Sequence, residues 1–339
     1  MRPFIYERAT DPVSAVRAAL NGADDVGTSG ERPQFLAGGT TLLDLMKLDV
    51  MRPRRVIDIN DLSSSHAGIA VGLDGLRLGA LVRMADAADH PELREAYPMV
   101  AQSLQLAASA QLRNMATLGG NVLQRTRCSY FRDTSWQACN KRNPGSGCAA
   151  LTGVNRKHAV LGTSDHCIAT YAGDFAQTLV ALDASVEISG DSGSRTLPFE
   201  QLHRLPGDTP DLETTLASGE LITGFFVPAG AWNRRSLYLK IRDRDSYEFA
   251  LASAAVALEL RDDLVAEARI GLGGVATKPW RAREAEAALK GKPLTEANAE
   301  AAAEMAFAGA RTSGQNDYKP ELGRRTLVRA LLQAAAMKV

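Results

Sequence analysis

The sequence predicts an α+β protein in which two α/β halves precede a C-terminal α+β domain. Three observations support this fold class. Short apolar segments with strand and helix periodicity alternate along the chain up to a composition change between Pro228 and Asn233. The last sixty or so residues are rich in Ala, Glu, Leu and Arg, which is typical of helices. A chain of 339 residues is long enough for two domains with cores of their own.

The N-terminal part is predicted to alternate strands and helices. Asp11 is a suitable N-cap because Pro12 follows it at the first helical position. In order, we expect a strand (Met1–Tyr6), a helix (Pro12–Leu20), a polar loop (21–33), a strand (Gln34–Ala37), a glycine loop (Gly38–Thr41), a helix from Leu42 and a strand (Arg55–Ile59).

The later elements follow from the same periodicities. Asp174 is the expected N-cap of a helix after a long irregular stretch. We expect a hairpin turning at Asp74-Gly75, helical structure from Met84 to about Ala116, a second glycine loop (Ala116–Gln124), an irregular segment (125–167), a helix through Leu182, strands at Ser185–Ile188 and 220–228 around a turn at Arg204–Pro210, two strand-and-turn units (236–260 and 268–280), and terminal helices with Pro320 near the start of the last.

The order of strand, glycine loop and helix around Gly38-Gly39-Thr40-Thr41 suits a phosphate group. Glycines let the main chain come close to a pyrophosphate, and free N–H groups with threonine hydroxyls supply donors. The stretch is neither a dinucleotide-binding GxGxxG nor a P-loop, since the required glycine spacing and lysine are missing. A plain tight turn is the alternative interpretation.

All four cysteines of the chain lie in the irregular segment, with ten, eight and eighteen residues between successive members. This spacing is too open for a zinc ribbon or a CxxC redox pair, and it points to a larger centre such as an iron-sulfur cluster. Zinc, buried thiols and two disulfides are the alternatives. His158 and His166 are not expected to be ligands, because the thiolates complete the set: Cys128, Cys139, Cys148 and Cys167.

The balance of charge excludes some classes of partner. Lysine and arginine together number 39, as do aspartate and glutamate, so nothing favours nucleic acid or an anionic membrane surface. No run reaches the roughly eighteen uncharged apolar residues of a spanning helix, and the N-terminus lacks the pattern of an export signal. We expect small molecules or proteins as partners, in the cytoplasm, or in the periplasm if a signal-bearing partner carries the folded chain.

In order along the chain, FLAGGTTLLDLMK, GLRLGALV, QLRNMATLGGN, GELI, LYLKIRDRDSYEFALASAA and LGGVATKPWR resemble the FAD-binding medium subunit of the molybdenum hydroxylase and xanthine dehydrogenase family. The resemblance implies a FAD-binding domain of the PCMH type at 1–228, with subdomains at about 1–60 and 61–228. It also implies a C-terminal α+β domain of the CO dehydrogenase flavoprotein type at 229–339.

The cysteine-rich insertion at 125–167 is similar to that of bacterial heterotrimeric aldehyde oxidoreductases, whose four cysteines bind a [4Fe-4S] cluster. The family implies that the first glycine block wraps the FAD pyrophosphate, that Asp174 binds the adenosine end, and that Lys240 approaches the isoalloxazine. Ala172-Gly173 departs from the Pro-Ser usual there, which removes a hydroxyl donor. The implied FAD contacts are Gln34, Phe35, Leu36, Ala37, Gly38, Gly39, Thr40, Thr41, Leu42, Thr117, Gly120, Asn121, Gln124, Asp174, Leu221 and Lys240.

The function that the resemblance implies is electron transfer within a molybdenum-dependent aldehyde oxidoreductase. The aldehyde would react on a large molybdenum-cofactor subunit, and electrons would pass through two [2Fe-2S] clusters of a small subunit to FAD in this chain and then to an external acceptor. No catalytic residue for aldehyde oxidation is expected here. Alternatives are a medium subunit of a purine or benzoyl-thioester dehydrogenase, and a non-redox scaffold with a metal-stapled docking loop.

Overall fold

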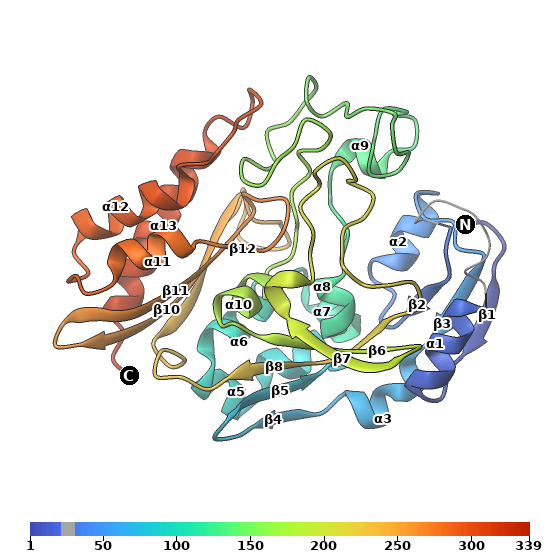
Figure 1. Cartoon of the computed structure of the whole chain (residues 1–339), viewed down its shortest axis with the longest axis horizontal. Coiled ribbons are helices and arrows are strands. Elements are labelled where there is room, and N and C mark those ends of the chain that lie inside the picture. Colours follow the sequence, from blue (N-terminus) through green and yellow to red (C-terminus); the bar gives the residue numbers. More distant parts are fainter. Residues whose placement is uncertain (22–30) are drawn as a thin grey trace.

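 The computed structural model describes residues 1–21 and 31–339 of the chain. Most of the predicted polar loop at 21–33 lies outside the described residues. The described residues form three sheets, each with its own helices, and confirm the predicted α+β class (Figure 1). None of the described helices is long and apolar enough to span a membrane.

The N-terminal sheet is parallel, with β3 (Arg55–Asp58) between β1 (Ile5–Arg8) and β2 (Gln34–Leu36). Alternate residues of a strand point to opposite faces, so Ile57 packs against α1 (Pro12–Leu20) and Val56 against α2 (Leu42–Lys47).

The start of α1 agrees with the prediction. The Asp11 carboxylate accepts a hydrogen bond from the Ser14 N–H at 2.9 Å, and the Ser14 hydroxyl in turn accepts from the Asp11 N–H. After β3 the chain forms a 3-10 turn, η1 (Asn60–Leu62), and the short helix α3 (Ser63–His66).

The central sheet is antiparallel, with β8 (Leu221–Pro228) in the middle of the order β4-β5-β8-β6-β7. The hairpin predicted at Asp74-Gly75 joins β4 (Ile69–Val71) to β5 (Gly75–Gly79). The partner of β6 (Ser185–Gly190) is β7 (Gly193–Pro198), which the sequence did not predict because its residues are mostly polar and exposed. The 3-10 turn η2 (Phe199–Gln201) follows it.

The helical stretch predicted from Met84 to Ala116 is four short helices. Pro91 and Pro98 each begin a new helix, because proline fits the first turn but disfavours helical geometry in the residue before it. The helices are α4 (Met84–Asp89), α5 (Pro91–Ala96), α6 (Pro98–Gln105) and α7 (Ala110–Met115).

The C-terminal sheet is antiparallel, in the order β12-β11-β10-β9, and its strand β10 (Ala252–Arg261) is buried on both faces. Ala255 and Ala257 belong to the core of the central domain, whereas Ala254 and Val256 pack beneath the C-terminal helices. The remaining elements are β9 (Ser236–Ile241), β11 (Leu264–Gly273), β12 (Trp280–Arg281), α11 (Arg283–Leu289), α12 (Glu296–Phe307) and α13 (Lys319–Ala335).

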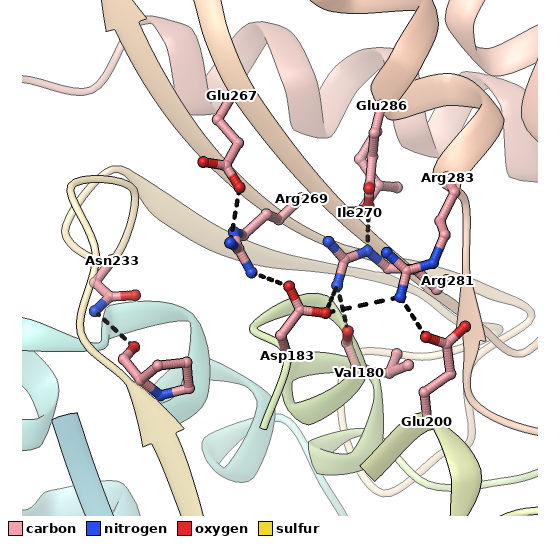
Figure 2. Close-up of polar contacts among 11 residues, drawn as sticks. Val180, Asp183, Glu200, Asn233, Glu267, Arg269, Ile270, Arg281, Arg283 and Glu286 are labelled. Atoms are coloured by element: carbon pink, nitrogen blue, oxygen red, sulfur yellow. Dashed lines mark hydrogen bonds and ion pairs between the residues drawn. The ribbon is translucent and has the colours of Figure 1, made fainter. Parts of the chain in front are cut away.

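Ion pairs join the central and C-terminal parts around Asp183, which follows α10 (Phe175–Ala181) (Figure 2). Its carboxylate accepts from Arg281 at 2.9 Å and from Arg269. Arg281 also donates to the Val180 carbonyl at 2.6 Å and pairs with Glu286. Because Arg281 is buried and its partners come from both parts, these contacts fix how the two parts are joined.

Candidate functional site

A cleft lies between the N-terminal sheet and the central sheet. It encloses about 930 Å³ of space open to solvent, a size typical of ligand sites. Its walls come from the end of β2, the glycine loop, the start of α2, the segment after Ala116 and the start of β8. The predicted FAD contacts that line it are Gln34, Phe35, Ala37, Gly38, Gly39, Thr40, Thr41, Leu42, Thr117, Gly120 and Leu221.

The glycine loop brings the main chain to the surface of this cleft. Gly39 has φ of 73°, in the left-handed region that glycine adopts without strain. A methyl group on Gly38 would collide with the Met115 carbonyl oxygen, so the loop passes directly against the opposite wall. Within the described part of the chain, the N–H groups of Gly39, Thr40 and Thr41 have no acceptor. They are available to a ligand's oxygen atoms.

The second wall differs from the predicted glycine loop, because the GGN residues form the short helix α8 (Leu118–Val122). Thr117 is its N-cap, and the hydroxyl oxygen accepts from the Gly120 N–H at 3.2 Å. The Gly119 N–H donates to the Ala80 carbonyl at 2.8 Å, which fixes the helix start to the central sheet. Gly119 and Gly120 leave room for close packing, because a Cβ would meet Ala80 at position 119 and the Thr117 hydroxyl at position 120. Neither glycine is needed for a turn.

Sequence reasoning missed several residues that line the cleft. Arg125 is the one with most chemical interest, because it lies over the Phe131 ring at 4.6 Å and its Nη2 is buried without a partner in the described structure. Its place directly after the GGN block was the available signal. The other missed lining residues are Met51, Ile59, Ala80, Leu81, Gly119, Leu123, Glu220 and Ile222.

Five of the predicted FAD contacts do not line the cleft. Leu36 packs against the apolar cluster that includes Met46. Asn121 lies behind the wall, where its Nδ2 contacts the Met84 sulfur at 3.4 Å and its Oδ1 is buried without a partner among the described residues. Gln124 lines a neighbouring cavity and donates to the Asn121 carbonyl. The remaining two are Asp174 and Lys240.

Asp174 and Lys240 form a buried ion pair with each other. The Lys240 Nζ is 2.8 Å from the Asp174 carboxylate, and the Tyr238 hydroxyl donates to the same carboxylate at 2.6 Å. The roles that the resemblance implies for them, Asp174 at the adenosine end of FAD and Lys240 near the isoalloxazine, stay a prediction. Asp174 is the N-cap residue of α10, as predicted, but its side chain makes no capping hydrogen bond, because its oxygens bond to Tyr238 and Lys240 of β9.

The departure at Ala172-Gly173 has a local cause. A Cβ on Gly173 would come within 2.6 Å of the Tyr171 ring. Tyr171 is buried and donates from its hydroxyl to the Val122 carbonyl at 2.9 Å, at the end of α8. Glycine therefore makes room for a tyrosine that supports the wall of the cleft.

The four cysteines converge on one cavity of about 290 Å³, and all four are free thiols. Cys139 and Cys148 face each other in a two-stranded bridge, and a tight turn links Ser164 to Cys167. Among the described residues, no three His, Cys, Asp or Glu side chains lie close enough together for a single metal ion.

Burial makes the thiols of this cavity weak acids. It raises the pKa of Cys128 to about 12 and that of Cys167 to about 11. Thiolates here would therefore need a compensating positive charge, which a metal centre would supply. The donor set, soft sulfur from four cysteines around one cavity, fits an iron-sulfur cluster.

The basic residues of the insertion are paired, so they form more than a solvated charged loop. Glu213 accepts from Arg125 at 2.6 Å and from Lys141 at 2.7 Å, and Asp44 of α2 pairs with Arg127 and Arg132. These pairs attach the insertion to α2 and to the loop between η2 and β8. Only one short helix, α9 (Ser129–Arg132), is present in this described segment.

Comparison with known proteins places this geometry in a family. A family model described as the FAD binding domain in molybdopterin dehydrogenase matches residues 11–230, and the CO dehydrogenase flavoprotein C-terminal domain matches residues 237–336. The chain therefore belongs to the FAD-binding medium subunits of the molybdenum hydroxylase family, and it is the flavoprotein part of an oxidoreductase.

Individual relatives cover nearly the whole chain. The aldehyde oxidoreductase FAD-binding subunit PaoB of Escherichia coli K12 is 43% identical, and the match covers 99% of both chains. The glyceraldehyde dehydrogenase medium chain of Sulfolobus acidocaldarius is 28% identical over 86% of this chain and 83% of its own. A solved chain of carbon monoxide dehydrogenase from Hydrogenophaga pseudoflava superposes with a TM-score of 0.75 at 26% identity, covering 98% of this chain and 97% of that one.

Proposed function

We propose that the chain is the FAD- and [4Fe-4S]-binding electron-transfer subunit of a molybdenum-dependent aldehyde oxidoreductase. The observation that carries the proposal is the pairing of two sites in one chain. One is the cleft built on a glycine loop with free N–H groups, and the other is the cavity lined by four cysteines. The 43% identity to an aldehyde oxidoreductase subunit supports the aldehyde as the substrate of the complex.

The residues of the cleft supply what a dinucleotide needs. The N–H groups of Gly39, Thr40 and Thr41 would bind pyrophosphate oxygens, and the Arg125 guanidinium adds a positive charge at the same cleft. Leu221 and the other apolar lining residues would exclude water from a flat ring. When bound, FAD would accept electrons and pass them on, while the protein holds and orients it.

The [4Fe-4S] cluster is proposed for Cys128, Cys139, Cys148 and Cys167. Support comes from the cavity that all four line and from their soft donor atoms. Its place beside the FAD cleft follows from Glu213 and Arg125, because Arg125 lines the cleft and shares Glu213 with Lys141, which lines the cysteine cavity.

We propose the same partners that the family implies: a small subunit with two [2Fe-2S] clusters, a large molybdenum-cofactor subunit and an external electron acceptor. The relatives' names as medium chains support such an assembly. The proposed division is a FAD-binding domain at 1–228 and a flavoprotein C-terminal domain at 229–339, which agrees with the two model matches at 11–230 and 237–336. The compartment stays a prediction.

The test is the cofactor content and spectrum of the chain purified anaerobically with its partners. We expect one FAD and about eight irons per complex, about four from this chain's cluster and about four from the two [2Fe-2S] clusters of the small subunit, with flavin absorption bands that bleach with dithionite. Only about four irons per complex, with zinc bound to this chain, would overturn the cluster, and the absence of flavin bands would favour the scaffold alternative.

A further inference from the structure

His158 lies against one of the four cysteines. Its Nε2 atom is 3.2 Å from the Cys128 sulfur, and the ring is buried, with 6% of the residue exposed. The other ring nitrogen, Nδ1, is buried and has no hydrogen-bond partner in the described part of the chain. The histidine is thus directed at the sulfur by one nitrogen alone.

Because only Nε2 has a partner, one tautomer of His158 is favoured when a cluster is bound. A proton on Nδ1 would leave a buried donor without an acceptor, which is costly, whereas a proton on Nε2 meets the sulfur. A cysteine that ligates metal is a thiolate and can only accept. The Nε2–H group is therefore the donor, and the Cys128 sulfur the acceptor.

The C-terminal domain holds His158 in this place. Lys319, at the start of α13, is buried and donates from Nζ to the Lys157 carbonyl at 3.0 Å and to the Gly274 carbonyl at 2.6 Å. The Asn155 side chain donates to the Ser313 carbonyl at 2.6 Å, and the Asn155 carbonyl accepts from the His158 N–H at 2.9 Å. The main chain on the N-terminal side of the imidazole is anchored to a second domain.

We propose that His158 is a positioning residue for the cluster, and that its hydrogen bond to the Cys128 thiolate raises the cluster's reduction potential. The inference rests on the proposed [4Fe-4S] site. Reduction adds one negative charge to the cluster and its thiolates, so a donor to sulfur stabilises the reduced state more than the oxidised one. One electron enters, and no proton or bond changes place.

The test uses the full chain loaded anaerobically with iron and sulfide, and follows the reduced cluster by electron paramagnetic resonance in a redox titration. We expect His158→Leu to lower the ratio of reduced to oxidised cluster about tenfold at a fixed potential, which equals about 59 mV for one electron. His158→Gln should restore most of it, since its amide can donate from a similar position.

His166 provides a matched control. It lines the cysteine cavity, but its Nε2 is 3.3 Å from Asp208 and half of its side chain is exposed. We expect His166→Gln to keep the wild-type potential. A loaded His158→Leu protein with the wild-type potential would overturn the inference and leave the cluster proposal intact, whereas a wild-type chain that takes up no cluster would overturn both.

A second measurement covers the case in which His158→Leu does not load. In the wild-type chain with ¹⁵N-labelled histidine, electron-nuclear double resonance on the reduced cluster should show an exchangeable proton and a histidine nitrogen coupled to it. The histidine nitrogen coupling should be absent in His158→Gln, whereas an exchangeable proton should remain coupled because the glutamine amide donates in its place. Absence of any histidine coupling in the loaded wild-type chain would contradict the hydrogen bond.

Discussion

Gly38 shows how a single missing side chain shapes the proposed FAD cleft. The main chain at Gly38 passes against the Met115 carbonyl, which belongs to the end of α7 and precedes the second wall. Any Cβ at this position would push the two walls apart. The neighbouring Gly39 adds the left-handed turn that exposes the N–H groups.

We therefore predict that Gly38→Ala weakens FAD binding. The collision should cost roughly 1–3 kcal/mol, by analogy with overpacked sites, which is about a tenfold to hundredfold rise in Kd. Flavin fluorescence titration of the full chain measures it. Gly68→Ala is the control, because a Cβ there meets no atom within 4 Å. Equal affinities for both variants would contradict the assigned role of Gly38.

Single residues also show where sequence reasoning stops. Asp11 and Pro12 act within one helix turn, so the predicted cap is confirmed. Asp174 is likewise the N-cap residue of α10, yet its side chain makes no capping hydrogen bond, because Lys240 and Tyr238 approach it from a strand more than sixty residues away. A capping rule based on neighbouring residues fails when a group that is distant in sequence bonds to the capping side chain instead. The pairing of these three residues could not be predicted without the fold.

At the scale of elements, the cysteine insertion is held by side chains from its surroundings. Glu213, in the loop between η2 and β8, is its main acidic anchor and binds both Arg125 and Lys141. The two cations hold the pKa of Glu213 at about 2 against the effect of burial. A carboxylate with a lowered pKa stabilises the folded state above its unfolded pKa and loses that contribution as the pH falls.

Glu213→Gln is therefore predicted to destabilise the chain by about 2 kcal/mol at pH 7, as measured by urea unfolding. Because glutamine does not titrate, the difference from wild type should narrow as the pH falls below about 4.5 toward 2. Asp208→Asn, at a side chain that is 94% exposed, is the control and should change stability little. A difference that does not narrow between pH 4.5 and pH 2.5 would contradict this account.

The elements were predictable where local signals are strong. The glycine loop between β2 and α2 and the hairpin at Asp74-Gly75 are where the sequence places them. The prediction of one continuous helical stretch was wrong at Pro91 and Pro98, where new helices begin. Proline in the sequence was a visible signal of these helix starts. The GGN helix was missed because its start is held by Ala80, which lies far away in sequence. The strand β7 was missed because most of its residues are polar and exposed.

At the scale of the whole molecule, the central and C-terminal parts share one buried boundary. The strand β10 contributes small side chains to the core on each side, and the network around Asp183 completes the junction (Figure 2). Arg281 has only 3% of its side chain exposed and contacts Asp183, Glu286 and the Val180 carbonyl. His158 is anchored from the same C-terminal part, so this junction also supports the cysteine cavity.

We predict that Arg281→Met lowers the free energy of unfolding by about 3 kcal/mol, because it leaves buried acceptors without a partner. Arg283→Met is a matched control in the same network. Its guanidinium is 55% exposed, so the loss should be below about 1 kcal/mol. Urea unfolding measures the loss of stability in both variants. Equal losses would contradict the prediction that burial makes Arg281 more important for stability than Arg283.

The central claim is that one chain holds FAD and an iron-sulfur cluster at two separate sites. The most direct test is the iron and flavin content of Cys148→Ser, purified anaerobically beside the wild-type chain. Because Cys148 lines the cysteine cavity and not the FAD cleft, the account predicts that iron falls sharply while most flavin stays bound. Full iron content in the variant, or equal loss of flavin and iron, would contradict it.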